Sequence, residues 1–379
     1  MMRILHIAKV TGIAGAENHL LVLLPELRAL GVDAEVVLLQ EPGRPVAQLV
    51  HALLAAGVPT FELAINMDID PWLVGRLARL VRSREPHGVH THGVHADLYG
   101  RLSLLGLDHV LLLQSRHNDD RFRRLWIMRL LNQWLAQRCA SIVAISDAVG
   151  EFVSSVEGIP QQKVERIYYG LDAAPVPQNT ADLRAELGWT GAPLVGFVGR
   201  LTGQKGVPVL LQAFATVLRA LPTARLLLMG DGPQRAKLEA LARELQIETA
   251  VHFAGWRADA RAQLATLNVL AIPSLWEGFG LVTLEAMQAG VAVVASRVSA
   301  LPEIVLDGET GLLVPAANAP KLAAALLALL QDPQRATQLG KNGRLRAAQC
   351  FTVKQMAARH AALYQSLAAP AAAIDRASN

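Results

Sequence analysis

The stretch Pro273-Ser-Leu-Trp-Glu-Gly-Phe-Gly-Leu-Val-Thr-Leu-Glu-Ala-Met-Gln-Ala-Gly290 decides how this chain folds. The apolar run Val269–Ile272 precedes it and Val291–Ala295 follows it, and both are typical of buried parallel strands. Between them, residues 280–287 are predicted to form a short helix that Gly290 ends. This order predicts an open α/β sheet with the glycine-bearing turn at its carboxyl edge, where ligands bind.

Two carboxylates bracket this turn eight positions apart, Glu277 in the loop and Glu285 within the helix. They point at different parts of one ligand, and each offers two acceptor oxygens that suit the paired hydroxyls of a ribose or a hexose. Gly278 and Gly280 allow the backbone to approach a ligand closely, and the start of the helix suits a phosphate. The alternative is a helix-surface carboxylate beside ordinary turn glycines.

The segment Glu277–Glu285 resembles the E-x7-E motif of family 4 retaining glycosyltransferases, which are two-domain GT-B enzymes that use nucleotide sugars. Leu301-Pro-Glu-Ile and Gly311-Leu-Leu-Val, which follow the motif, also fit this family. The resemblance implies that Glu277 is a catalytic residue that orients the donor sugar and that Glu285 holds the ribose. The donor-binding residues that it implies in this stretch are Glu277, Gly278, Phe279, Gly280, Leu281 and Glu285.

A second glycine-bearing turn, Val198-Gly-Arg-Leu-Thr-Gly-Gln-Lys-Gly206, follows a predicted strand and precedes a predicted helix. Arg200 and Lys205 lie among its glycines, so it combines close backbone approach with two cations, as a phosphate cradle does. It resembles the G-R-L-x-x-x-K-G motif of the same family, whose arginine and lysine hold the donor diphosphate and which makes both residues catalytic and donor-binding. A surface loop with incidental cations is the alternative.

Further turns fit the same family more loosely. Met229-Gly-Asp-Gly-Pro233 resembles its G-x-G-P turn beside the nucleotide, which implies that Gly230 binds the donor. Gly12-Ile-Ala-Gly15 resembles its N-terminal glycine turn, which implies that Gly15 approaches the donor phosphate. Trp256 ends a segment that resembles the one flanking the base, although a lone tryptophan is more often a core residue.

The composition of the 379-residue chain is that of a folded protein with two cores, since 52% of its residues are apolar. Cys139 and Cys350 lie far apart and outside any C-x-x-C, which argues against a disulfide framework or a zinc ribbon. Residues 1–180 carry a net charge of −1 and the remainder +5, so the positive excess lies in the half with the motifs, as a phosphorylated ligand favours. No signal peptide or transmembrane helix is predicted.

The domain boundaries follow from alternating strands and helices, which begin at Met2 and restart at Ala192. Between the two series, residues 173–180 contain two prolines and no apolar periodicity, which indicates a linker. Thr352-Val-Lys-Gln355 is a capping box that opens a last helix. The predicted parts are a first domain over 1–172, a linker over 173–190, a second domain over 191–351, a helix over about 352–367 and a flexible tail over 368–379.

The resemblance implies the GT-B fold, in which two Rossmann-like doubly wound parallel-sheet domains of the α/β class face each other across a cleft. It further implies that the first domain binds the acceptor and the second binds the nucleotide sugar. The last helix is expected to pack back on the first domain.

Histidines and aspartates in the first half are further candidate site residues. His117, in Ser115-Arg-His-Asn118, follows a predicted strand end, and the resemblance implies that it contacts the donor sugar as a catalytic residue. His90-Thr-His92 puts two imidazoles on one face of a strand, a pattern of metal sites, but it resembles the family's own H-x-H-G. Asp68-Ile-Asp70 matches the D-x-D of GT-A transferases, which the GT-B resemblance makes incidental. No metal site is predicted.

Residues 116–138 carry six arginines against two aspartates, and residues 121–138 are predicted to form one long helix that also carries Trp126 and Trp134. Arginine and tryptophan together suit a lipid headgroup interface. An anionic membrane surface and a lipid-linked acceptor are therefore the predicted partners of Arg121, Arg123, Arg124 and Trp126. A domain-packing helix is the alternative, because the arginines scatter around its axis.

The resemblance implies a retaining hexosyltransferase that moves a sugar from a UDP- or GDP-sugar to a saccharide or lipid-linked saccharide. No metal or other cofactor is expected, because Arg200 and Lys205 take the role that a metal plays elsewhere at a leaving diphosphate. Analogy suggests cell-surface polysaccharide or lipopolysaccharide biosynthesis, in the cytoplasm or on the inner face of its membrane, with no nucleic-acid partner. The alternatives are a GT-B nucleotide-sugar epimerase or hydrolase, a non-catalytic nucleotide-sugar sensor, and a NAD-binding protein.

Overall fold

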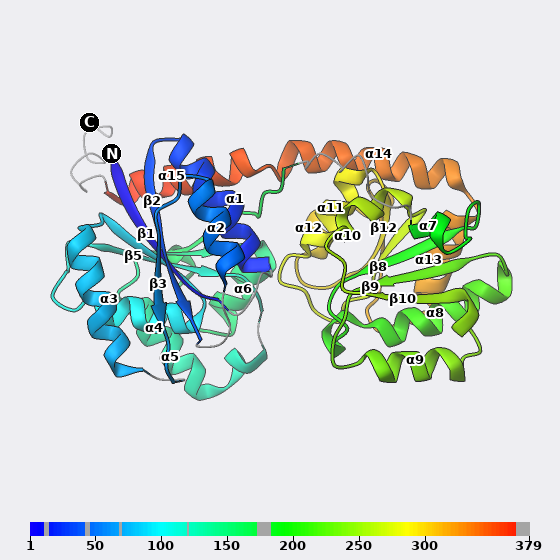
Figure 1. Ribbon diagram of the computed structural model, residues 1–379, viewed down its shortest axis with the longest axis horizontal. Helices are drawn as coiled ribbons and strands as arrows, with labels where there is room; N and C mark the ends of the chain where they lie inside the picture. The colour runs from blue at the N-terminus through cyan, green and yellow to red at the C-terminus, as the bar shows by residue number, and fades with distance from the viewer. Residues whose placement is uncertain (11–14, 42–45, 68–69, 120, 173–182, 369–379) are drawn as a thin grey trace. The chain divides into compact units, whose positions relative to one another are not determined.

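The structure is a computed structural model that describes residues 1–10, 15–41, 46–67, 70–119, 121–172 and 183–368 (Figure 1). It divides into two compact units. The first consists of Met1–Gly170 together with Thr352–Asn379, and the second of Leu171–Phe351. The chain thus returns to the first unit at Thr352, the residue at which the capping box begins.

The first unit is built on a seven-stranded parallel sheet in the order β3-β2-β1-β4-β5-β6-β7. Its central strands are largely buried because helices cover both faces, with α1 and α15 on one side and α3 and α4 on the other (Figure 1). The strands are β1 (Met2–Val10), β2 (Val32–Gln40), β3 (Thr60–Ala64), β4 (Gly88–His92), β5 (Leu111–Arg116), β6 (Ser141–Ala144) and β7 (Val164–Arg166). The helices are α1 (Gly15–Ala29), α2 (Ala47–Ala55), α3 (Pro71–Arg84), α4 (Val94–Ser103), η1 (Arg121–Arg124), α5 (Trp126–Gln137), α6 (Asp147–Ser155), η2 (Gln161–Lys163) and α15 (Val353–Ala368).

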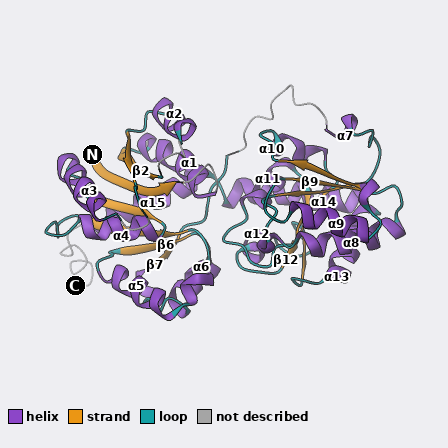
Figure 2. Cartoon of the chain, turned by 60° about the horizontal axis from the view of Figure 1, so that its bottom comes forward, coloured by secondary structure: helices purple, strands orange, loops and turns teal. Residues whose placement is uncertain are grey.

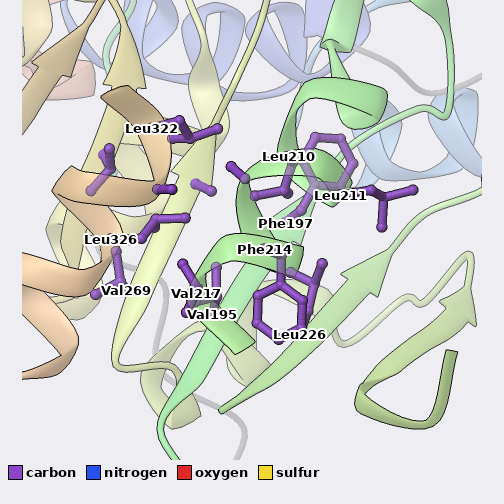
Figure 3. Close-up of a cluster of buried hydrophobic side chains, with 14 of the residues drawn as sticks. Val195, Phe197, Leu210, Leu211, Phe214, Val217, Leu226, Val269, Leu322 and Leu326 are labelled. Carbon is purple, nitrogen blue, oxygen red and sulfur yellow. The ribbon is translucent and has the colours of Figure 1, made fainter. Parts of the chain in front are cut away.

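The second unit is a six-stranded parallel sheet in the order β10-β9-β8-β11-β12-β13, again flanked by helices (Figure 2). The strands are β8 (Leu194–Val198), β9 (Arg225–Met229), β10 (Val251–Gly255), β11 (Val269–Ile272), β12 (Ala292–Ser296) and β13 (Leu312–Val314). The helices are α7 (Leu183–Glu186), η3 (Gly203–Lys205), α8 (Val207–Ala220), α9 (Arg235–Glu244), η4 (Glu248–Ala250), α10 (Ala260–Gln263), η5 (Leu264–Thr266), α11 (Leu281–Ala289), α12 (Leu301–Ile304), α13 (Ala319–Leu330) and α14 (Pro333–Cys350). Its core is a cluster of buried side chains that includes Phe197 of β8, Phe214 of α8, and Leu322 and Leu326 of α13 (Figure 3).

Both sheets wind outward in two directions from a central pair of strands, which is the doubly wound arrangement. The pair is β1 and β4 in the first unit and β8 and β11 in the second. Chain connections leave such a pair in opposite directions, so the loops at the carboxyl ends of its two strands part and leave room for a ligand. In the second unit these loops are residues 199–206 and 273–280, which are the two glycine-bearing turns that the sequence singles out.

The last helix, α15, lies against α1 of the first unit. Its capping box is formed: the N–H of Gln355 donates to the Thr352 hydroxyl at 3.2 Å, and the Gln355 side chain accepts from the Thr352 N–H at 3.4 Å. The chain passes so close to Gly170 that a Cβ there would lie 2.2 Å from the Thr352 carbonyl oxygen. Gly170 therefore permits α15 to meet the end of the first unit.

One sequence prediction about local structure is wrong. The helix predicted over residues 121–138 is interrupted at Leu125, which has the extended dihedral angles φ −62° and ψ 134°, so a 3₁₀ turn precedes a shorter α5. Within the predicted linker, residues 183–186 form the short helix α7, and residues 173–182 lie outside the described residues. Among the described helices, none is both long and apolar enough to cross a membrane.

A buried network of charges accompanies the break before α5. Arg116 is fully buried and donates to Asp97 at 2.7 Å and to Glu157 at 3.3 Å. Arg123, at the end of η1, also turns inward and donates to Glu157 at 3.1 Å. Arg123 thus gives buried Glu157 a second cation beside Arg116, and the chain departs from helical dihedral angles two residues later, at Leu125.

We predict that Arg116→Met lowers the free energy of unfolding by about 3–5 kcal/mol, because it leaves two buried carboxylates without their shared cation. The measurement is urea unfolding of the purified chain. The control is Arg166→Met, which removes an exposed pair with Asp147 and should cost at most about 1 kcal/mol. Equal losses in the two variants would contradict a structural role for the buried network.

Candidate functional site

The turn after β8 is held against the turn after β9 by backbone hydrogen bonds. The Gly199 N–H donates to the carbonyl of Met229 at 3.0 Å, and the Leu201 N–H donates to that of Asp231 at 2.9 Å. Gly230 has a φ of 143°, and a Cβ at this position would lie 1.9 Å from the Gly199 carbonyl oxygen. Glycine is therefore required at residue 230 for two backbones to meet at the carboxyl end of the sheet.

The turns after β8 and β11 also touch each other directly. Gly206, just before α8, has a φ of 64°, and a Cβ there would lie 2.0 Å from the carbonyl oxygen of Pro273. The Leu275 N–H donates to the carbonyl of Gln204 at 2.8 Å, and the Gln204 side-chain amide donates to the carbonyl of Trp276 at 3.1 Å. These contacts fix the two turns as one rigid surface.

An ion pair lies where these two turns meet. The Lys205 ammonium donates to Oε2 of Glu277 at 2.6 Å, and the Ser274 hydroxyl donates to the same oxygen at 3.0 Å. The Glu277 N–H donates to the hydroxyl of Ser299 at 3.2 Å. Lys205 and Glu277, 72 residues apart in the chain, are thus brought together, and each holds the other in place at the mouth of the sheet.

The helix after β11 begins at Leu281 and ends at Ala289, close to the predicted 280–287. Gly280 caps its start with a φ of 87°, and Gly290 caps its end with a φ of 74°, the left-handed conformation expected of a terminating glycine. A Cβ at Gly280 would lie 3.0 Å from Leu301 and 3.3 Å from Cγ of Glu277. Glycine at residue 280 therefore lets the helix start immediately beside the Glu277 side chain.

Two predicted donor-binding side chains have no partner within the described part of the chain. The Arg200 guanidinium is exposed and makes no hydrogen bond or ion pair to a described residue. The Glu285 carboxylate, half-buried on α11, likewise accepts no hydrogen bond from one, and its burial raises the pKa while Arg261 partly lowers it. Such groups are available to a ligand. The cation can bind a negative charge, and the carboxylate can accept hydrogen bonds from hydroxyl groups.

The remaining predicted residues of this stretch divide into backbone and core positions. Gly278 is a buried loop residue and Leu281 is the first residue of α11. The Phe279 side chain is buried and packs edge-to-face against Phe351, with ring centroids 6.0 Å apart. Phe279 can therefore face a ligand with its backbone only, because its ring is part of the core.

Trp256 is a residue for which the expectation of a core position is wrong. It follows the edge strand β10 and is 76% exposed. Its indole lies at the carboxyl ends of the strands, as do Arg200 after β8 and Glu277 after β11 of the same sheet. The signal in the sequence was its place directly after a strand, where side chains of a parallel sheet face ligands.

In the first unit, His117 follows β5, as predicted, but both of its ring nitrogens face protein groups. Its Nε2 lies 3.0 Å from Nδ1 of His92, and its Nδ1 contacts the Tyr169 hydroxyl. Gly15 is the first residue of α1, and residues 11–14 before it lie outside the described residues. Asp70 caps α3 by accepting from the Leu73 N–H at 3.1 Å, which gives it a structural role, and Asp68 lies outside the described residues.

The arginine-rich segment presents apolar side chains rather than a ring of arginines. Arg123 is buried against Glu157, which contradicts its predicted place on the surface, and nothing is described of the Arg121 side chain. Arg124 is exposed, and Trp126 is 72% exposed. Six of the fourteen large apolar side chains that are exposed in the described residues lie in this segment, namely Phe122, Leu125, Trp126, Ile127, Leu130 and Trp134.

Comparisons with known proteins agree with this architecture. The family model described as "Glycosyltransferase Family 4" matches residues 13–174, and the one described as "Glycosyl transferases group 1" matches residues 179–346. The chain is 31% identical to the MMP alpha-(1->4)-mannosyltransferase of Mycolicibacterium hassiacum over 71% of its own length and 67% of that protein. It is 29% identical to the alpha-maltose-1-phosphate synthase of Mycolicibacterium smegmatis over 94% of its length and 96% of that protein.

Among solved structures, the crystal structure of Anabaena HepE in complex with UDP and glucose superposes with a TM-score of 0.84. The superposition covers 97% of this chain and all of that one, at 23% identity, which establishes the likeness of fold. The two family models, the mannosyltransferase relative and the paired parallel sheets lead to one conclusion: this chain belongs to the family 4 glycosyltransferases of the GT-B fold.

Proposed function

We propose that this glycosyltransferase moves a hexose from a UDP- or GDP-sugar to a saccharide or lipid-linked saccharide, with retention of configuration and without a metal ion at the diphosphate. The observation that carries this proposal is the grouping of Arg200, Lys205 and Glu277 at the carboxyl edge of β8 and β11. Two cations from one turn beside a carboxylate from the other suit a diphosphate joined to a sugar.

In this proposal the Arg200 guanidinium and the Lys205 ammonium neutralise the charge that builds on the leaving diphosphate. Glu277, already fixed by Lys205 and Ser274, accepts hydrogen bonds from hydroxyls of the donor sugar. Glu285 accepts from the two ribose hydroxyls, and Trp256 offers an exposed aromatic face to the base. These roles follow the chemistry of each group and its position on one edge of the sheet.

The reaction that fits this site is a displacement on one face of the sugar. The acceptor oxygen bonds to the anomeric carbon on the side from which the diphosphate leaves, as the carbon–oxygen bond to the diphosphate breaks. The proton of the acceptor hydroxyl passes to the departing phosphate oxygen, so that charge and atoms balance. His117 would join by orienting the donor sugar only if one of its ring nitrogens exchanged His92 or Tyr169 for a sugar hydroxyl.

The comparisons support this proposal at the level of chemistry. Relatives of the chain include a mannosyltransferase and a maltose-1-phosphate synthase, and HepE was crystallised with UDP and glucose. An epimerase or hydrolase remains the alternative, and analysis of products with and without an acceptor saccharide distinguishes the two. Release of free sugar or an epimerised donor, with no transfer to any acceptor, would replace the proposed reaction.

We also propose that the exposed apolar side chains of η1 and α5 rest on an anionic inner-leaflet surface that carries the acceptor. Trp126, Leu130 and Trp134 recur every four residues, so they share one face of α5. Arg124 and Arg129 are exposed in the same segment and suit acidic headgroups. Burial of the apolar face, helped by these cations, would hold the enzyme at the interface. A place in polysaccharide or lipopolysaccharide biosynthesis fits such an acceptor.

Replacing Arg200 by alanine is expected to lower kcat roughly 10²-fold or more, because a charge that stabilises the leaving diphosphate is removed. The measurement is nucleotide release with whichever nucleotide sugar the wild type turns over. Arg219→Ala, an exposed arginine on α8, is the control and should leave turnover unchanged. Wild-type turnover in Arg200→Ala would remove this residue from the donor site.

Protonation of Glu285 should weaken donor binding, because a carboxyl group accepts fewer hydrogen bonds than a carboxylate. Burial raises its pKa, so the donor KM should rise as pH falls through that raised value and should be lowest above it. Glu285→Gln should raise KM at neutral pH by roughly 10- to 100-fold, corresponding to about 1.5–3 kcal/mol for hydrogen bonds to a charged group. The same acidic rise in KM in both proteins would contradict the role of Glu285.

Changing Trp126, Ile127 and Leu130 together to serine is expected to reduce co-sedimentation with anionic vesicles at least about tenfold. The reason is that the variant lacks the apolar surface that the wild type would transfer from water into the membrane interface. Leu345→Ser, an exposed leucine on α14, is the control. Binding of wild type should also weaken as salt rises, to the extent that arginines contribute. Equal binding by the triple variant would exclude this face as the membrane contact.

A further inference from the structure

Six histidines gather beneath α1 and α15 in the first unit. They come from β1, α1, β4, the end of β5 and α15: His6, His19, His90, His92, His117 and His360. His6 pairs with His90 in the β1–β4 register, and His92 lies two residues further along β4. Because side chains alternate along a strand, all three point to one face of the sheet. Figure 1 shows α1 and α15 on the same side of β1.

Three of these imidazoles are close enough to share one ion. His6, His90 and His92 can each offer one ring nitrogen so that the three atoms lie within 4.8 Å of one another. Nδ1 of His6 and Nε2 of His92 lie 3.0 Å apart in a hydrogen bond that a shared ion would replace, and all three rings are buried. A tetrahedral zinc ion with Zn–N bonds of about 2.0–2.1 Å holds its nitrogens roughly 3.3 Å apart, so small side-chain shifts would close the set.

The cluster also contains buried nitrogens without partners. Within the described residues, Nε2 of His6, both ring nitrogens of His19 and Nε2 of His360 make no hydrogen bond. Buried polar atoms almost always have a hydrogen-bond partner. Four such nitrogens without one, in a single cluster, indicate room for a partner that the described side chains do not supply. His19 is the unpartnered ring nearest His92, with ring centroids 6.0 Å apart, and could supply a fourth ligand.

Hydrogen-bond partners hold the ring of His90 in a fixed orientation. His90 contacts the Ser115 hydroxyl through Nε2 at 2.8 Å and the Tyr364 hydroxyl through Nδ1 at 2.7 Å. Such partners fix the ring orientation of a ligating histidine.

We propose that His6, His90 and His92 bind one divalent transition-metal ion, of which zinc is the best fit to three imidazoles. The H-x-H of β4 alone did not predict this, because the third ligand comes from the neighbouring strand β1. The site lies within the first unit, where the ion would join β1 to β4, and it is adjacent to His117, whose Nε2 lies 3.0 Å from Nδ1 of His92.

The test uses the full chain without a histidine tag, first freed of metal with a chelator. Added Zn²⁺ should bind at one ion per chain, by elemental analysis after dialysis, and should raise Tm until one equivalent is present. Co²⁺ as a probe should give the visible absorption of a tetrahedral nitrogen site. No bound ion and no change in Tm would overturn the proposal and leave a hydrogen-bonded imidazole cluster instead.

Variants locate the ion. His92→Gln should abolish stoichiometric binding, whereas His109→Ala, an exposed histidine of the same unit, should not alter it. Because a buried substitution can impair folding, Ser115→Ala and Tyr364→Phe provide gentler changes on either side of His90. One of these two hydroxyls must remain bonded to the ring nitrogen of His90 that does not bind the ion. Loss of that hydroxyl should weaken the binding of the ion roughly 10- to 100-fold. Unchanged affinity in both variants would exclude His90 and overturn the assignment.

Discussion

The contact between the turns after β8 and β11 is the constraint on which the candidate donor site depends. A Cβ on Gly206 would lie 2.0 Å from the Pro273 carbonyl oxygen, so the two turns meet backbone to backbone. That closeness lets Lys205 reach Glu277 at 2.6 Å across 72 residues of sequence. The closeness itself follows from the strand order, since β8 and β11 are the neighbours from which the sheet winds in opposite directions.

The two units use charge and polarity differently. In the first unit, Arg116, Asp97 and Glu157 are fully buried and compensate one another, because isolated charges in a core are costly. In the second unit, the side chains of Arg200 and Glu285 make no hydrogen bond or ion pair with a described residue, although both lie at the carboxyl edge of the sheet. Stability accounts for the first arrangement, whereas the second leaves chemical groups available to a ligand.

Some sequence predictions failed for reasons that can be named. The arginine-rich segment was predicted to be one helix with Arg123 on its surface. Instead, Arg123 is buried and donates to Glu157, and the helix is interrupted at Leu125. Trp256 was expected in a core and is exposed. In both residues the local pattern is ambiguous, since arginine and tryptophan each combine a long apolar body with a polar end and can serve either environment.

The sequence by itself determined the two α/β units, the turns around Arg200 and Glu277 and the capping box at Thr352, because these depend on local apolar runs, glycines and caps. It could not determine which distant groups meet. The Lys205–Glu277 pair, the inward turn of Arg123 and the convergence of His6 with His90 and His92 arise from strand order and register, which bring together residues that no local spacing connects. Only the tertiary structure decides such contacts, because burial and charge compensation are properties of the packed chain.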